Sequence, residues 1–157
     1  MTNPAQHEFS THEGTYRQSE VSAVVGNGVA SWERASHDVL YWKVKTASGF
    51  TVDSSGPVVP GENVNVTARM FGISVVEPVQ VVSVVQEKDR VGFAYKTLPG
   101  HPVSGEEAFI VHRHGEEVSL SVRSLTGPSP AQPWRMLYPL LLIIQRIVRR
   151  RYLRALR

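Results

Sequence analysis

The chain has 157 residues, of which 41% are hydrophobic and 20% are charged. This composition is typical of a single folded domain and argues against a disordered chain. Cysteine is absent, which excludes a disulfide framework, a thiolate metal site and a cysteine nucleophile. The first residues lack the basic and apolar stretches of a secretory signal, and no apolar run is long enough to span a bilayer, so we expect a cytoplasmic protein.

The net charge of +3 is unevenly distributed along the chain. Residues 1–130 contain ten Lys and Arg against fourteen Asp and Glu, whereas residues 131–157 contain seven Arg and no acidic residue. The basic character therefore belongs to the C-terminal segment. A local basic face of this kind favours nucleic acid, an anionic membrane or an acidic protein surface as a partner.

The first part of the chain predicts a lead-in, a strand and a helix. Residues 1–14 are polar, and we expect them to be a loose lead-in to a single domain over residues 15–157. A strand is predicted over residues 16–25, and the Gly-Asn-Gly sequence that follows ends it. Apolar residues then recur at helical spacing over residues 29–42, which predicts an amphipathic helix.

The middle of the chain predicts an antiparallel sheet. Residues 44–46 and 50–52 have the pattern of one broken strand. Short turns separate the segments that follow, which favours hairpins and therefore antiparallel pairing. These further strands are predicted over residues 64–70, 79–86, 91–98, 107–113 and 118–123.

Residues 133–157 have the pattern of a long helix. Pro139 predicts that the regular helix begins there or is kinked nearby. Leu142 and Ile143 lie off the main apolar stripe, so their apolar side chains indicate a dimer or membrane contact. The predicted fold is α+β, with a curved antiparallel sheet of about six to seven strands gripping this helix. The apolar stripe consists of Leu137, Leu140, Leu141, Ile144, Val148, Tyr152 and Ala155.

The most distinctive stretch runs from Gly92 to Pro102 and continues as Gly-Glu-Glu-Ala-Phe over residues 105–109. Together with Val25-Gly26-Asn27-Gly28 and the ending from Gln145 to Leu156, it resembles the "domain of unknown function nineteen-ninety" family of small bacterial and plant proteins. Lys96 departs from the family pattern, where glycine is expected. The resemblance implies no established activity.

The order of elements also resembles the START-like helix-grip fold. That resemblance implies a mostly apolar cavity between a curved sheet and the last helix. The side chains of Phe93, Tyr95 and Thr97 share one strand face, and we expect this face to point inward. The predicted ligand-binding residues are Phe93, Tyr95, Phe109, Leu141 and Ile144.

Three polar residues of the distinctive stretch are candidates for the mouth of such a cavity. We predict Tyr95 and Glu106 as polar anchors and His101 as a rim residue. Adjacent residues of a strand point to opposite faces, so only one of Glu106 and Glu107 can face His101. We prefer Glu106, because Glu107 shares a face with Phe109.

Two hypotheses follow for this region, beside a purely structural role in which Pro and Gly fix the turn. The leading one is a non-enzymatic domain that binds a small apolar ligand. The second is an enzyme of cyclase or isomerase type that uses His101 and Glu106 as acid and base. No nucleophile, dinucleotide or phosphate-binding motif is present, so we expect no cofactor. His112 and His114 lack a third ligand nearby, so we expect no metal site.

The C-terminal arginines support a third hypothesis, an interaction module for anionic lipid, RNA or protein. The alternative is a solvated polar face whose arginine stems lie along the fold. The sequence leaves the oligomeric state open. The predicted basic surface consists of Arg146, Arg149, Arg150 and Arg154.

Overall fold

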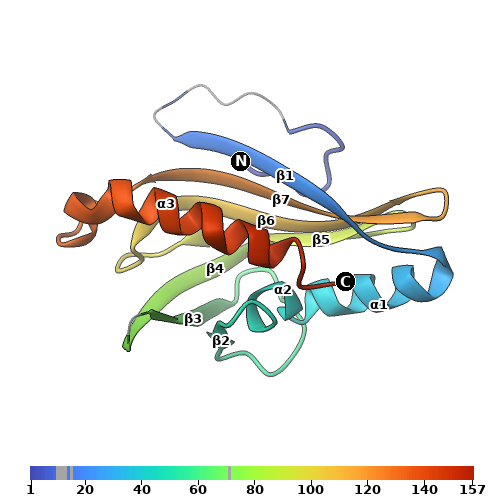
Figure 1. Cartoon of the computed structure of the whole chain (residues 1–157), viewed down its shortest axis with the longest axis horizontal. Helices are drawn as coiled ribbons and strands as arrows, with labels where there is room; N and C mark the ends of the chain where they lie inside the picture. The colour runs from blue at the N-terminus through green and yellow to red at the C-terminus, as the bar shows by residue number, and fades with distance from the viewer. Residues whose placement is uncertain (10–13, 15, 71) are drawn as a thin grey trace.

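The computed structural model describes residues 1–9, 14, 16–70 and 72–157, and within them the chain forms one antiparallel sheet and three helices (Figure 1). The sheet has the order β1-β7-β6-β5-β4-β3-β2, so each strand from β2 to β7 lies beside its neighbour in the sequence. The strands are β1 (Arg17–Asn27), β2 (Thr51–Val52), β3 (Asn63–Met70), β4 (Ile73–Glu87), β5 (Arg90–Thr97), β6 (Val103–His114) and β7 (Glu117–Pro128). The helices are α1 (Gly28–Leu40), α2 (Lys43–Thr46) and α3 (Trp134–Tyr152).

The curved sheet is covered on one face by α3, as predicted, and also by α1, which was not expected to cover it. The long helix α3 crosses β6 and β7, while α1 packs against β1, β5 and β6 (Figure 1). The ladder register shifts within β1 after Val24 and within β4 after Val81. Such irregularities bend and twist a strand, which helps the sheet to curve around the helices.

The two faces of β5 and β6 are buried in different places, as the strand alternation predicts. Phe93 and Phe109 belong to the main core, where Trp42 meets Phe93 edge to face with ring centroids 4.9 Å apart. Ala94 and Ala108 belong to a separate buried cluster on the other face. Edge-to-face aromatic pairs contribute about 0.5–1.5 kcal/mol beyond their buried area, so this contact adds to the stability of the core.

The predicted strand over residues 44–46 is wrong, because these residues form helix α2. Trp42 adopts a left-handed conformation, with φ 62°, which ends α1 at Leu40. Its carbonyl then accepts hydrogen bonds from the backbone N–H groups of Lys45 and Thr46, each over 3.0 Å. A large residue in this conformation is uncommon, and here it starts a second short helix in a new direction.

Strand β4 begins at Ile73, earlier than the predicted start at residue 79. The prediction stopped at Pro78, since proline cannot donate a backbone hydrogen bond. The carbonyl of Pro78 points toward β5 and accepts from the N–H of Leu98 over 2.9 Å. The pairing of β4 with β5 begins only at Val79, so the missing N–H of Pro78 interrupts no pairing.

Pro139 does not mark the start of the C-terminal helix. Helix α3 begins at Trp134 and continues through Pro139.

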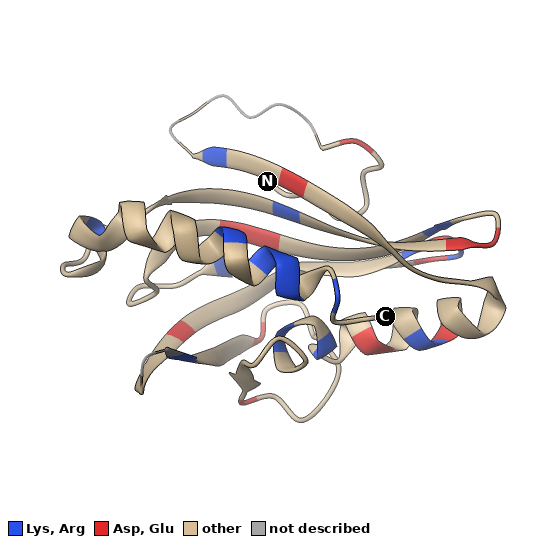
Figure 2. Ribbon diagram, viewed as in Figure 1, with Lys and Arg blue, Asp and Glu red and all other residues tan. Residues whose placement is uncertain are grey.

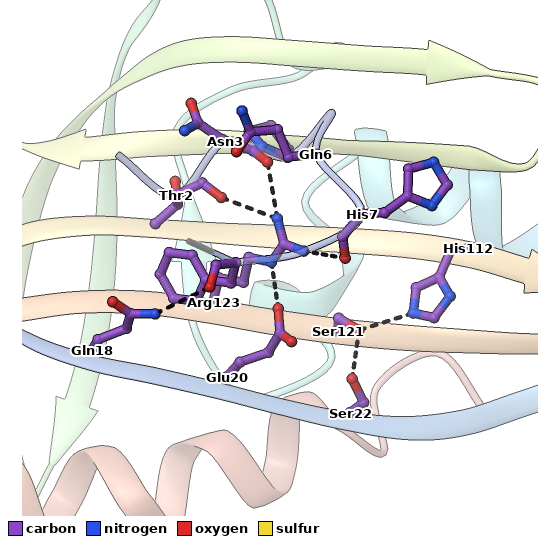
Figure 3. A network of polar contacts seen from close by, with 12 residues as sticks. Thr2, Asn3, Gln6, His7, Gln18, Glu20, Ser22, His112, Ser121 and Arg123 are labelled. Atoms are coloured by element: carbon purple, nitrogen blue, oxygen red, sulfur yellow. Dashed lines mark hydrogen bonds and ion pairs between the residues drawn. The ribbon is translucent and has the colours of Figure 1, made fainter. Parts of the chain in front are cut away.

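The N-terminal residues are attached to the sheet, and the expectation of a loose lead-in is wrong for residues 1–7. The buried guanidinium of Arg123, on β7, donates hydrogen bonds to the carbonyls of Asn3 (2.9 Å) and His7 (3.0 Å) and pairs with the carboxylate of Glu20 on β1 (Figure 3). Arg90, on β5, donates to the carbonyls of Pro4 and Gln6, each over 2.6 Å. Residues 10–13 lie outside the described residues.

Candidate ligand pocket

A pocket of about 470 Å³ lies between the sheet and α3. Its walls are mostly apolar. The helix supplies Leu137, Leu141, Ile144 and Val148, and β4 supplies Ile73 and Val75 on the opposite side. A volume of this size is within the range of pockets that take small organic molecules.

The polar residues of the pocket centre on Lys45 of α2, whose side chain is 4% exposed. Its ammonium donates a hydrogen bond to the hydroxyl of Tyr152 over 2.6 Å and lies 3.4 Å from the carboxylate of Glu107. It also lies 4.6 Å from the ring centroid of Phe50 and 5.4 Å from that of Tyr95. The charge of Lys45 is thus balanced by a carboxylate and by aromatic faces.

Glu107 links Lys45 to the sheet. The hydroxyl of Tyr95 donates to one of its carboxylate oxygens over 2.5 Å, and the hydroxyl of Ser124 donates to the other over 3.4 Å. Burial and the neighbouring Glu107 charge raise the pKa values of Tyr95 and Tyr152 well above the usual range. Both tyrosines are therefore neutral hydrogen-bonding groups at physiological pH.

A second carboxylate, that of Glu77 on β4, lines the same pocket. Burial raises the pKa of Glu77, the charge of Lys45 lowers it, and the charge of Glu107 raises it. The neighbours of Glu77 in the sheet are apolar, since Val66 lies directly across from it on β3. This position therefore places an acidic group in an apolar wall.

His101 is buried at the pocket and is held as a neutral ring. Its Nδ1 accepts a hydrogen bond from the backbone N–H of Val103 over 3.1 Å, so the proton of the neutral ring is on Nε2. Burial, together with the charge of Lys45, lowers the pKa of His101 to about 3. An imidazole with this pKa is a poor acid or base at neutral pH.

Glu106 and Glu107 both line the pocket, but they have different partners. Glu107 is the cross-strand partner of Tyr95, and its carboxylate contacts the hydroxyl of Tyr95 and the ammonium of Lys45. Glu106 also lines the pocket, but its carboxylate accepts hydrogen bonds from the backbone N–H and the hydroxyl of Thr2, over 3.5 and 3.3 Å. Tyr95 is therefore paired with Glu107, and Glu106 as a polar anchor for a ligand stays a prediction.

The other predicted ligand residues divide into two groups. Tyr95, Leu141 and Ile144 line the pocket. Phe93 and Phe109 lie instead in the packed core, where their rings are 5.7 Å apart and fully buried. They support the pocket from behind and do not form its wall.

The sequence interpretation missed Lys45, Glu77 and the hydroxyl of Tyr152. Lys45 was placed on a strand, and Tyr152 was treated only as part of an apolar stripe. Glu77 lay outside the predicted strand, although it alternates with Val75 and Val79. A charged residue at an inward position of a β-branched strand was the one signal available for it.

The arginines of the C-terminal helix gather toward its end (Figure 2). Arg146, Arg150 and Arg154 are exposed, whereas Arg149 is half-buried and burial lowers its pKa. The outward side of α3 is also apolar in its first turns, where Met136 is 76% and Ile143 56% exposed.

Within the described part of the chain, none of the helices has the length and apolarity needed to cross a membrane. The same residues contain no group of three or more His, Asp or Glu side chains arranged to hold a metal ion. His112 donates to or accepts from the hydroxyl of Ser121 over 2.9 Å (Figure 3).

Comparison with known proteins identifies the family. Residues 5–155 match the family "Domain of unknown function (DUF1990)". The chain belongs to this family. A UPF0548 protein of Deinococcus radiodurans is 47% identical over 45 residues, which cover 29% of this chain and 23% of the relative. The UPF0548 protein At2g17695 of Arabidopsis thaliana is 28% identical over 113 residues, 68% of this chain and 55% of the relative. The DUF1990 chain thus matches only part of the length of these relatives.

Solved structures share the fold of this DUF1990 domain. Hypothetical protein jhp0584 of Helicobacter pylori superimposes with a TM-score of 0.62 at 9% identity, covering 90% of this chain and 85% of its own. TTHA0849 of Thermus thermophilus has a TM-score of 0.62 at 10% identity, with coverages of 89% and 94%. Ara h 8.0201 has a TM-score of 0.54 at 13% identity, with coverages of 88% and 96%. At these identities the likeness establishes the helix-grip architecture alone.

Proposed function

We propose that this DUF1990 domain binds a small molecule with a largely apolar body in the pocket between the sheet and α3. The observation that carries the proposal is the pocket itself, with about 470 Å³ of space bounded by Leu141, Ile144 and Val148 on one side. A packed core leaves few voids larger than a water molecule, so a space of this size beside buried polar groups is typical of a binding site.

A pair of neighbouring substitutions on α3 tests the proposal. Ile144→Trp adds a ring to the pocket wall, whereas Ile143→Trp adds the same ring on the exposed side of the helix. The probe is the neutral dye N-phenyl-1-naphthylamine, whose fluorescence increases in an apolar site. We expect the wild type and Ile143→Trp to bind the dye and Ile144→Trp to lose binding. Equal binding by both variants, or no binding by the wild type, contradicts the proposal.

The cyclase or isomerase hypothesis has less support from the geometry. His101 and Glu106 both line the pocket, but each already has its own partner, Val103 and Thr2 respectively. The low pKa of His101 removes the proton transfer for which the histidine was chosen. We therefore propose binding, without catalysis by His101 and Glu106, as the function of the pocket.

The cytoplasmic location of the protein stays a prediction.

A second candidate function is contact with an anionic membrane surface through the outward side of α3. The exposed arginines supply positive charge, and the exposed Met136, Ile143 and Ile147 supply apolar side chains on the same helix. This combination favours a lipid surface over RNA, which needs no exposed aliphatic side chains for its recognition.

A further inference from the structure

The two carboxylates Glu77 and Glu107, which both line the pocket, differ in their partners. The charge of Lys45 acts on the carboxylates of both Glu107 and Glu77. Its ammonium lies 3.4 Å from Glu107, whereas it attracts Glu77 only over a longer distance. Among the described residues, none forms a hydrogen bond with the carboxylate of Glu77 or an ion pair with it. An ionised carboxylate in apolar surroundings is unfavourable unless it has a partner. Glu77 therefore lacks the partner that the rest of the cluster has.

The described residues around Glu77 supply no such partner. Val66, across the ladder on β3, and Val79, two positions along β4, are both fully buried and apolar. Glu77 itself remains partly accessible and belongs to the pocket wall. A molecule in the pocket can therefore reach its carboxylate and supply the partner.

The lysine is less available to a ligand than the carboxylate. The ammonium of Lys45 is engaged by Glu107, by the hydroxyl of Tyr152 and by the surrounding aromatic rings. An incoming ligand carboxylate would have to displace Glu107 and would be repelled by Glu77. A ligand cation at Glu77 displaces no existing partner, although the charge of Lys45 opposes it at longer range.

We infer that the pocket takes a ligand with an apolar body and a protonated amine, and that the ammonium of the ligand pairs with Glu77. This inference rests on the proposed function, since it names the chemical class that the same pocket binds. The apolar walls from α3 and β4 hold the body of the ligand. The carboxylate determines the charge of its polar end.

Three probes with the same alkyl chain test the inference: decylamine, decanol and decanoic acid, each below its micellar concentration and near neutral pH. Isothermal titration calorimetry on the full chain gives the affinities. We expect decylamine to bind at least about tenfold more tightly than decanoic acid, because only the amine pairs with Glu77. In Glu77→Gln the preference for decylamine over decanol should fall to about twofold or less.

The control is Glu87→Gln, which changes an exposed carboxylate at the other end of β4 and should keep the wild-type preference. A thermal unfolding curve confirms that each variant is folded. If Glu77→Gln does not fold, the comparison of the three probes on the wild type decides the question. Equal affinity for all three probes, or a preference for the acid, overturns the inference and leaves the proposed function intact. Failure of decanol and the other probes to bind overturns both.

Discussion

Lys45 and Tyr152 are 107 residues apart in the sequence, and the ammonium of one donates a hydrogen bond to the hydroxyl of the other over 2.6 Å. The contact joins helix α2 to the last residue of α3. Because Lys45 also reaches Glu107 on β6, this one side chain connects two helices to the sheet at the base of the pocket. Its removal should therefore affect both stability and the shape of the site.

Lys45→Met should destabilise the fold by about 3–5 kcal/mol, because it leaves the buried carboxylate of Glu107 without its cation. Urea denaturation measures the free energy of unfolding. Lys43→Met is the matched control, since Lys43 is exposed on the same short helix, and it should change the stability by no more than about 0.5 kcal/mol. Adding Glu107→Gln to Lys45→Met should restore part of the loss. A Lys45→Met protein as stable as the wild type would show that the pair does not contribute.

His101 should make the stability of the protein depend on pH. Its pKa is about 3 in the folded state and 6.5 in the unfolded reference, so the unfolded state takes up a proton first as the pH falls. The stability that the neutral ring contributes is fully present above pH 6.5 and is lost toward pH 3, at up to about 1.4 kcal/mol for each pH unit. His101→Gln should show a shallower decline in urea denaturation over this range. His114→Gln, at an exposed position, should keep the wild-type profile, and parallel curves for all three proteins would contradict the assignment.

The sequence predicts those parts of the fold that depend on local repetition. Alternation placed Phe93 and Tyr95 on the inner face of β5 and Ala94 on the other, and the structure agrees. The same rule separated Glu106 from Glu107, but it could not tell which of them pairs with Tyr95. Tyr95 could have decided this choice, because its cross-strand partner is Glu107, but the register of β5 against β6 was unknown.

The polar base of the pocket could not be predicted in this way. The position of Lys45 depends on the left-handed conformation of Trp42, which propensities disfavour. Its partner Tyr152 comes from the far end of the chain, and contacts between distant segments leave no periodic pattern. The N-terminal residues were misjudged for the same reason, since the side chains that bind them, Arg90 and Arg123, belong to distant strands.

Gly92, in the most distinctive stretch of the sequence, should not tolerate a side chain. A Cβ at this position would collide with the backbone carbonyl oxygen of Phe109 on the neighbouring strand. Gly92→Ala should therefore destabilise the domain by about 1–3 kcal/mol in urea denaturation. Gly56→Ala is the control, because a Cβ there meets nothing within 4 Å. If both variants match the wild type, the stretch is not constrained by this close approach.

Arg123 should determine whether the N-terminal residues stay on the sheet. Its guanidinium holds the carbonyls of Asn3 and His7 and pairs with Glu20. Arg123→Met keeps most of the side-chain volume but removes these donors, so amide hydrogen exchange in the first residues should become markedly faster. Arg113→Met removes a partly exposed arginine that pairs with Asp89, and it should leave that exchange unchanged. Unaltered exchange in Arg123→Met would mean that other contacts hold the segment.

The outward side of α3 should bind anionic vesicles if it is a membrane contact. Replacing Arg146, Arg150 and Arg154 together with alanine removes three exposed positive charges, and co-sedimentation with phosphatidylglycerol vesicles should fall by about tenfold or more. Raising the salt concentration should weaken wild-type binding in the same way, because exposed charges are screened. Neutral phosphatidylcholine vesicles should bind the wild type poorly.

Two further variants separate charge from apolar insertion on this helix. Met136, Ile143 and Ile147 changed together to serine keep every arginine, so a surface that uses both features should lose part of its affinity for anionic vesicles. Arg69→Ala, an exposed change on β3, is the control and should bind like the wild type. Binding that responds to the arginines but not to the serine variant would indicate purely electrostatic contact. Absence of vesicle binding by the wild type at low salt would leave the arginines as a solvated face and remove the second candidate function.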